Sequence, residues 1–208
     1  MEEQKTLVVE TTNLKKEARI IGIDDGHHAR ETSEPVLVVG AVLRGKSYLD
    51  NVLATTITAD GIDATPNLIK MVNTSRAKGN LSAIMLDGVT LGGFNVVNIK
   101  SLSENTNLPV IVAVRKEPDY EAIQAALKNI EDGEQKFKLI ELAGDICELE
   151  IKNKQTEGKM YFQFAGCTLP EAEDFLKLAI IHSLIPEPVR TAHLIAQGIT
   201  LGESKGRV

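Results

Sequence analysis

The sequence predicts an α/β fold built on a mixed sheet, in which an antiparallel meander of three strands is followed by parallel strands with flanking helices. Three strand-like runs rich in Val, Ile, Leu and Thr come first, separated by short polar turns. Apolar runs of strand length then alternate with segments of helical spacing. Two apolar runs end in Asp-Gly, at Asp25-Gly26 and Asp87-Gly88, which is typical of a buried strand that emerges into a loop.

The meander and the first helix occupy the N-terminal part of the chain. The three strands are expected at residues 19–25, 35–44 and 48–59, where β-branched residues are frequent. Thr65-Pro66 then begins a helix, because Thr is a favourable N-cap and Pro fits the first turn. Apolar residues at helical spacing continue this helix to Gly79.

The order of the next elements determines which strands are neighbours. A strand at 81–86, a helix at 94–102, a strand at 108–114 and a helix at 118–130 complete the order βββαβαβα. A crossover helix would return the chain parallel to its first strand, so the strands that carry the two Asp-Gly ends lie side by side. This order predicts a ribonuclease H-like mixed sheet.

The remaining segments extend this sheet and add a C-terminal helical segment. A strand is expected at 137–142, a hairpin at 146–164 and a helix at 170–182. A last helix follows Pro186-Glu187-Pro188 and ends near Gly198. The 208 residues contain 43% hydrophobic residues and no repeat or linker, so a single domain is predicted over residues 1–208.

Composition and charge restrict the classes of function. No apolar run approaches the roughly 18 residues of a membrane span, and Met1–Leu7 is charged, so a soluble, cytoplasmic protein without a membrane partner is expected. The net charge of −6 counts against a nonspecific nucleic-acid coat. Local phosphate contacts remain possible, and the candidate pairs are Arg44 with Lys46, Arg115 with Lys116, and Lys205 with Arg207.

The two strand-end carboxylates predict a metal site. Side chains at the tips of neighbouring parallel strands lie about 5 Å apart, and two carboxylates at that distance repel each other unless a cation joins them. Asp24 and Asp87 are therefore candidate ligands, although Asp-Gly is also favourable turn chemistry. Cys147 and Cys167 lack a CxxC spacing, so they are expected to be buried thiols, and the metal would be held by oxygen.

Several motifs resemble those of the endonuclease V superfamily, and in particular an archaeal family of small proteins related to it. Leu184-Ile185-Pro186-Glu187-Pro188-Val189-Arg190-Thr191-Ala192-His193 is similar to a segment near the end of endonuclease V proteins. Gly22-Ile23-Asp24 and Leu86-Asp87-Gly88 match the family's two aspartate motifs. The segment from Leu108 to Lys116 resembles its Pro-Thr-Ile-Gly-Val-Ala-Lys-Lys. The resemblance covers roughly residues 18–200.

The resemblance implies roles for individual residues. Asp24 and Asp87 would be ligands of Mg²⁺ or Mn²⁺, and His193 would lie close to the metal and position water. Arg115 stands where the family has a lysine near the scissile phosphate, which a guanidinium can hold bidentately. Further substrate contacts are expected at four residues: Asp63, Phe94, Lys116 and Arg190.

The chain departs from the family between the two aspartates. Endonuclease V proteins have a glutamate ligand there, preceded by a Pro-Tyr wedge that probes the damaged base, and the wedge is missing from residues 57–65. Asp60 or Asp63 is the candidate third carboxylate. Asp60 is preferred because it stands at the strand tip, whereas Asp63 can instead cap the following helix. His27 and His28 are either proton carriers near the metal or ordinary solvated histidines.

The resemblance and the carboxylates together predict a metal-dependent endonuclease. It would hydrolyse DNA or RNA near a deaminated base such as deoxyuridine or deoxyinosine, with a role in DNA repair. The everted base would need a pocket, for which the loops at 60–63 and 91–94 are the candidate walls. The alternative is a noncatalytic nucleic-acid or nucleotide binding module on the same fold. The oligomeric state is not predicted.

Overall fold

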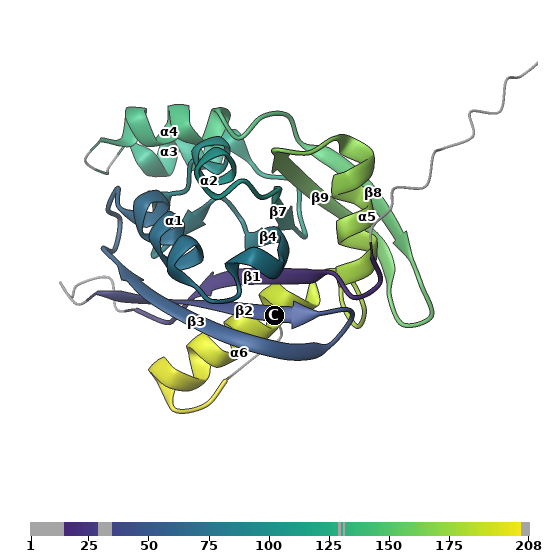
Figure 1. Ribbon diagram of the computed structural model, residues 1–208. Coiled ribbons are helices and arrows are strands. Elements are labelled where there is room, and N and C mark those ends of the chain that lie inside the picture. Colours follow the sequence, from purple (N-terminus) through teal and green to yellow (C-terminus); the bar gives the residue numbers. More distant parts are fainter. Residues whose placement is uncertain (1–14, 29–34, 129, 131, 205–208) are drawn as a thin grey trace, which may run out of the picture.

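The computed structural model describes residues 15–28, 35–128, 130 and 132–204. Met1–Leu7 and the basic pair Lys205 and Arg207, for which expectations were formed, lie outside these residues. Seven strands form one mixed sheet in the order β3-β2-β1-β4-β7-β9-β8 (Figure 1). They are β1 (Arg19–Asp25), β2 (Val36–Arg44), β3 (Tyr48–Ile57), β4 (Leu81–Asp87), β7 (Val110–Val114), β8 (Cys147–Lys152) and β9 (Glu157–Ala165).

The strand directions agree with the predicted mixed sheet. β1, β2 and β3 form an antiparallel meander, and β1 then pairs in parallel with β4, which pairs in parallel with β7. The hairpin of β8 and β9 adds to the other side of β7 in antiparallel orientation. The α/β fold class is therefore confirmed, and β1 lies inside the sheet between β2 and β4.

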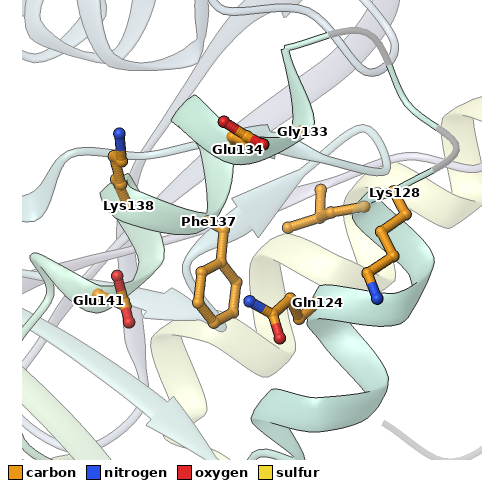
Figure 2. A pocket seen from close by; sticks show the side chains of 8 residues that line it. Gln124, Lys128, Gly133, Glu134, Phe137, Lys138 and Glu141 are labelled. Carbon is orange, nitrogen blue, oxygen red and sulfur yellow. The ribbon is translucent and has the colours of Figure 1, made fainter.

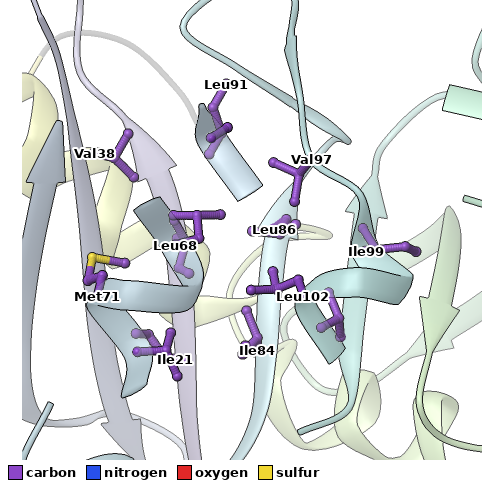
Figure 3. Close-up of a cluster of buried hydrophobic side chains, with 14 of the residues drawn as sticks. Ile21, Val38, Leu68, Met71, Ile84, Leu86, Leu91, Val97, Ile99 and Leu102 are labelled. Carbon is purple, nitrogen blue, oxygen red and sulfur yellow. The ribbon is translucent and has the colours of Figure 1, made fainter. Parts of the chain in front are cut away.

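Helices cover both faces of the sheet (Figure 1). Side chains alternate between the faces of a strand, so Ile21 and Ile84 pack with α1 and α2, whereas Ile20 and Met85 pack with α5. Figure 3 shows the cluster on the α1 and α2 face. The helices are α1 (Ala64–Thr74), α2 (Ile99–Thr106), α3 (Tyr120–Leu127), α4 (Gly133–Glu141), α5 (Leu169–Ala179) and α6 (Glu187–Leu201), with a short 3-10 turn η1 (Lys78–Asn80).

The strand predicted at 137–142 is wrong, because residues 137–141 belong to α4 and Leu142 is its C-cap. The segment is rich in helix-forming Glu, Gln, Lys and Leu, and its apolar residues Phe137 and Ile140 are three positions apart, so both fall on one helix face. The predicted helix at 94–102 begins only at Ile99, where the Asn98 side chain accepts a hydrogen bond from the Ser101 amide. The residues before it form the small hairpin β5 (Thr90–Leu91) and β6 (Asn95–Val96).

Other boundaries differ by a few residues. The first helix begins at Ala64, with Asp63 rather than Thr65 at the N-cap position. α5 ends at Ala179, and α6 continues past Gly198 to Leu201, where Gly202 ends it with a positive φ of 81°. Among the described residues, no helix combines the length and apolarity that crossing a bilayer requires.

α6 approaches β1 closely because β1 contains Gly22. A Cβ atom at position 22 would overlap the backbone of Pro188 and Val189 in the first turn of α6. Further along the helix, Ala192 and Ala196 are fully buried against β2. Small residues on both elements thus bring the α6 backbone onto the sheet, which fixes where its polar side chains can reach.

Two asparagine side chains bind main-chain groups at the outer edge of β3. Asn51 Oδ1 accepts a hydrogen bond from the Val52 amide at 2.8 Å. Asn67 on α1 donates from Nδ2 to the Thr56 carbonyl at 3.0 Å. These main-chain groups lie on the side of β3 that has no neighbouring strand, so the asparagines take the place of a ladder partner.

Candidate active site

The register of the central strands brings Asp24 and Asp87 together. Ile23 on β1 pairs with Leu86 on β4 in parallel, so the next residues along the two strands are Asp24 and Asp87. Both follow runs of buried residues. They also lie on the same face as Ile20 and Met85, which is the face that α6 covers. The predicted meeting of two carboxylates at one sheet edge is thus present in the structure.

His193 reaches this pair from α6. Its Nδ1 lies 2.6 Å from Asp24 Oδ2, and because an ionised carboxylate only accepts, Nδ1 is the donor. The other oxygen, Asp24 Oδ1, accepts from the Asp25 amide at 2.9 Å. Asp24 is 7% exposed. The predicted proximity of His193 to the carboxylates is therefore seen, and it depends on the close contact of α6 with β1.

A pocket of about 300 Å³ opens in front of these side chains. Its walls come from the end of β1, the end of β4 and the outer half of α6. The lining residues are Asp24, Asp25, Gly26, His27, His28, Asp87, His193 and Gln197. Of the two histidines that follow β1, His28 is the one within ion-pair range of a carboxylate, with Nδ1 3.8 Å from Asp25 Oδ2. Three carboxylates and three imidazoles therefore share one pocket.

Burial and mutual repulsion alter the protonation of two of the carboxylates. Burial raises the pKa of Asp87 to about 6, and the charge of Asp24 adds to the effect, while Arg115 and His193 oppose it. Burial and the Asp24 charge likewise raise the pKa of Asp25 to about 6, against the Gly92 amide and His28. The hydrogen bond to Asp24 raises the pKa of His193 above its ordinary value. The pocket is thus a site of crowded negative charge.

The predicted substrate-binding cations are placed differently from one another. Arg115 follows β7 and is close enough to Asp87 for its charge to lower the pKa of that carboxyl. Lys116 beside it is exposed. Arg190 is held by Glu187, with Nε donating to Oε2 at 2.9 Å and Nη2 donating to Oε1. Its guanidinium is therefore engaged within α6.

Asp60 and Asp63 do not line the pocket. Asp60 has a positive φ of 51°, and its Oδ1 accepts from the Phe94 amide at 2.7 Å, which ties the end of β3 to the β5–β6 hairpin. Asp63 accepts hydrogen bonds from Thr58 and from Asn95 Nδ2. Burial acts to raise the pKa of Asp63, but these hydrogen bonds outweigh it and hold the pKa below its ordinary value.

A second cavity, of about 360 Å³, lies between α3 and α4 and contains none of the predicted site residues. Figure 2 shows Phe137 of α4 beside this space, with Gln124 of α3 and Lys128, the residue that follows α3, near it. Charged residues surround the opening, among them Glu134 and Lys138. Of the residues predicted for the site, Asp24, Asp87 and His193 line the pocket at the ends of β1 and β4.

Comparison with known families decides where the chain belongs. A family model described as endonuclease dU matches residues 16–200, which is nearly the whole of the sequence. The chain belongs to the endonuclease dU family. This agrees with the resemblance to archaeal relatives of endonuclease V found in the sequence. Membership in this family supports a nuclease-type function.

Relatives of this endonuclease dU family chain occur in archaea. A UPF0215 protein of Methanothermobacter thermautotrophicus is 49% identical over 194 residues, which cover 93% of each chain. A crystal structure of a protein of unknown function from Archaeoglobus fulgidus is 39% identical, with a TM-score of 0.76 over 88% of this chain and 98% of that one.

Endonuclease V structures are more distant. Endonuclease V of Ciona intestinalis, solved with a 24mer DNA containing an inosine followed by a ribo-adenosine, has a TM-score of 0.52 and 16% identity over 84% of this chain and 82% of that one. At this identity the likeness concerns the fold alone. The chain thus has the ribonuclease H-like fold of endonuclease V, as the order of its elements predicted.

Sequence reasoning missed Asp25 as a member of the site. The sequence analysis assigned only Asp24 of Asp24-Asp25-Gly26 to the site and placed the third carboxylate after β3. In the structure, the third carboxylate that lines the pocket is Asp25 of β1. The doubled aspartate was the available signal. Among the residues that the structure describes, no group of three His, Cys, Asp or Glu side chains is arranged as a ready-made metal site.

Replacing Asp87 by asparagine is expected to stabilise the metal-free protein at pH 8 and to change its stability little near pH 4. The folded-state pKa of about 6 exceeds the ordinary value of 3.8, so the folded protein binds more protons between these values and loses stability as the pH rises through them. We expect a gain on the order of 1–3 kcal/mol in the free energy of unfolding. Urea denaturation with a chelator at both pH values measures it.

The control for this prediction is Asp145→Asn, since Asp145 is exposed and lies outside the pocket. Its free energy of unfolding should follow that of the unsubstituted protein at both pH values. If Asp87→Asn is instead less stable than the unsubstituted protein at pH 8, the ionised Asp87 carboxylate stabilises the fold. The prediction that its burial lowers the free energy of unfolding would then be wrong.

Proposed function

We propose that the chain is a divalent-metal-dependent endonuclease that hydrolyses a phosphodiester bond in DNA or RNA near a deaminated base such as deoxyuridine or deoxyinosine. The observation that carries the proposal is the convergence of Asp24, Asp87 and His193 in one open pocket of an endonuclease dU family chain. A role in DNA repair and a cytoplasmic location are parts of the same proposal.

The donor set of the pocket fits a hard divalent cation. Mg²⁺ is commonly held by one or two carboxylates and keeps several water molecules, so the pair of Asp24 and Asp87 is sufficient without a third protein ligand. Burial and repulsion raise the pKa of Asp87 and Asp25, and a cation would relieve that repulsion. Asp24 and Asp87 would hold Mg²⁺ or Mn²⁺, and the further carboxylate in the same pocket is Asp25 rather than Asp60. When bound, the cation would supply an activated water and neutralise charge on the phosphate.

The remaining residues of the pocket have roles that follow from their positions. His193, fixed by its hydrogen bond to Asp24, has its other ring nitrogen available to orient a water molecule or to transfer a proton. Arg115, beside Asp87, would hold a phosphate oxygen of the substrate. Lys116, exposed next to it, would contact the neighbouring phosphate.

The loops that would receive the target base are tied together by hydrogen bonds. Asp60 Oδ1 accepts from the Phe94 amide, and Lys136 Nζ donates to the Asp60 carbonyl. Asp63 and Asn95 join the same loops from the other side. We assign Asp60 and Asp63 to the support of this base-binding region, with Phe94 as its stacking residue. Arg190 would act indirectly, through the Glu187 pair that stabilises the start of α6.

The test uses labelled oligonucleotides that carry uracil, hypoxanthine or no lesion, incubated first with Mg²⁺ and then with Mn²⁺. We expect lesion-dependent nicking that disappears when the metal is chelated and in Asp87→Ala. Nicking that persists in Asp87→Ala would come from another site or from a contaminating nuclease, and the proposal would then fail.

The second candidate function is a noncatalytic nucleic-acid binding module. It is favoured by one observation, that the described residues contain no ready-made group of three metal-ligating side chains. A calorimetric titration with Mn²⁺ separates the two functions. Mn²⁺ binding by the unsubstituted protein that is lost in Asp24→Asn supports the endonuclease. The absence of binding by the unsubstituted protein at millimolar Mn²⁺ supports the binding module.

A further inference from the structure

The end of β1 opposite the active site carries a pair of arginines that face each other. Arg19 on β1 pairs directly with Arg44 on β2. Like charges placed opposite each other on neighbouring strands repel, so such a pair is destabilising unless anions lie nearby. Asp50 accepts from Arg19 Nε at 2.6 Å, which neutralises only one of the two guanidinium groups closely.

Arg44 has unused hydrogen-bonding capacity. Its Nε is buried and has no hydrogen-bond partner, the only such buried side-chain nitrogen or oxygen among the residues that the structure describes. The Glu17 carboxylate lies 4.0 Å from it, which is outside hydrogen-bond range. The Arg44 side chain as a whole is 38% exposed, so an anion in solvent can approach its guanidinium group.

Tyr48 lies against this arginine and is largely open to solvent. The Arg44 guanidinium carbon is 4.7 Å from the centre of the Tyr48 ring, within the range of a cation–π contact. The side chain is nevertheless 59% exposed at the start of the outermost strand β3. An aromatic ring fixed by a guanidinium on one side leaves the other side available for stacking.

A polar cavity adjoins the same strand end. It has a volume of about 420 Å³, and its walls include Lys15 and Arg19 together with Asn80 and Ser82. Lys46, in the turn between β2 and β3, is also exposed. Four cations therefore lie at this end of the sheet, against the carboxylates of Glu17 and Asp50, in a chain whose net charge is −6.

We propose that this surface, composed of Lys15, Arg19, Arg44 and Tyr48, is a second binding site for single-stranded nucleic acid. One base stacks on Tyr48, and the neighbouring phosphates contact the two guanidinium groups. The surface lies about 17 Å from the active site, the length of the five residues from Arg19 to Asp24 along β1. The inference rests on the proposed nucleic-acid substrate, and it adds a contact that the cleavage chemistry does not need.

The absence of tryptophan from the sequence gives a direct test. In Tyr48→Trp the new side chain is the only tryptophan, so its fluorescence reports on this surface alone. In Tyr161→Trp the tryptophan lies on β9 opposite Val114, one residue before Arg115, and reports on the active-site end. Each protein is titrated with a short oligothymidylate in the presence of a chelator, which prevents cleavage.

We expect the oligothymidylate to quench the tryptophan at position 48. Arg44→Gln and Tyr48→Ala should each weaken binding of the same oligonucleotide about tenfold, measured by anisotropy of a labelled strand. Arg44→Gln should also reduce the salt dependence of binding by about one phosphate contact. Lys154→Gln, an exposed cation in the β8–β9 turn, is the matched control and should leave binding unchanged. Tyr48→Ala removes an exposed ring, so it tests the site even if Arg44→Gln unfolds.

The outcomes separate this inference from the proposed function. If the oligonucleotide quenches the tryptophan at position 48 but the protein nicks no oligonucleotide, the second binding site is supported and only the endonuclease proposal fails. A response at position 161 with none at position 48 overturns the second site and leaves the endonuclease proposal standing. A dimer in sedimentation that Tyr48→Ala dissociates, with unchanged oligonucleotide binding, also overturns it, because the surface would then join two copies of the chain.

Discussion

Replacing Asp24 by asparagine is expected to lower the rate of metal-dependent cleavage by about a thousand-fold, with the fold retained. The substitution keeps the shape of the side chain but removes the charge at the centre of the pocket, where Asp24 adjoins Asp87 and binds His193. A bound metal supplies several kcal/mol of stabilisation to the transition state, and each 1.36 kcal/mol is a factor of ten in rate. Single-turnover cleavage of a lesion-containing oligonucleotide measures the loss.

Two measurements make this prediction specific. Asp145→Asn removes the same charge from an exposed position outside the pocket and should leave the rate unchanged. In the metal-free Asp24→Asn protein, the pKa of His193 should fall, because the hydrogen bond to Asp24 is the largest cause of its elevation. An NMR titration of the histidine ring measures that pKa. A cleavage rate within tenfold of the unsubstituted protein would remove Asp24 from the proposed chemistry.

Replacing Gly22 by alanine is expected to destabilise the protein by ~3 kcal/mol or more. The new methyl group would overlap the backbone of Pro188 and Val189, and a helix backbone cannot yield as a flexible side chain can. α6 would have to move away from β1, which would carry His193 away from Asp24. Urea denaturation measures the stability, and nicking should fall even under conditions where the variant is folded.

Gly198→Ala is the matched control because it lies on the same helix. A Cβ atom at position 198 meets no neighbouring atom, and alanine is the better helix former. This substitution should therefore raise the free energy of unfolding by roughly 0.5–1 kcal/mol. Equal effects of the two substitutions would mean that the contact between α6 and β1 is looser than the structure indicates.

The sequence was sufficient to predict the centre of the sheet and its two aspartates. Strand alternation and the crossover order are local rules, and together they place Asp24 and Asp87 side by side without knowledge of the rest of the chain. The residues around His193 were found only through the family resemblance, because no local pattern reveals that α6 lies against Gly22.

The rest of the site depends on contacts that no local pattern contains. Asp60 does not line the pocket, and its carboxylate instead accepts a hydrogen bond from the Phe94 amide, which is 34 positions distant in the sequence. Asp63 is held by Asn95 in the same way. The sequence alone does not reveal these partners, so each aspartate had the residue type and the position at a strand end that are typical of a metal ligand. The segment now in α4 was ambiguous because a short apolar run fits either period until its neighbours are known.

The asparagine side chains at the outer edge of β3 affect the tendency of the protein to aggregate at high concentration. A ten-residue outer strand with exposed Leu49 and Val52 resembles the segments that recruit identical chains into fibrils. Asn51 and Asn67 occupy main-chain groups that such recruitment would need. These two hydrogen bonds are expected to hinder the pairing of β3 with a second chain, while Tyr48 at the start of the strand stays open to a different ligand.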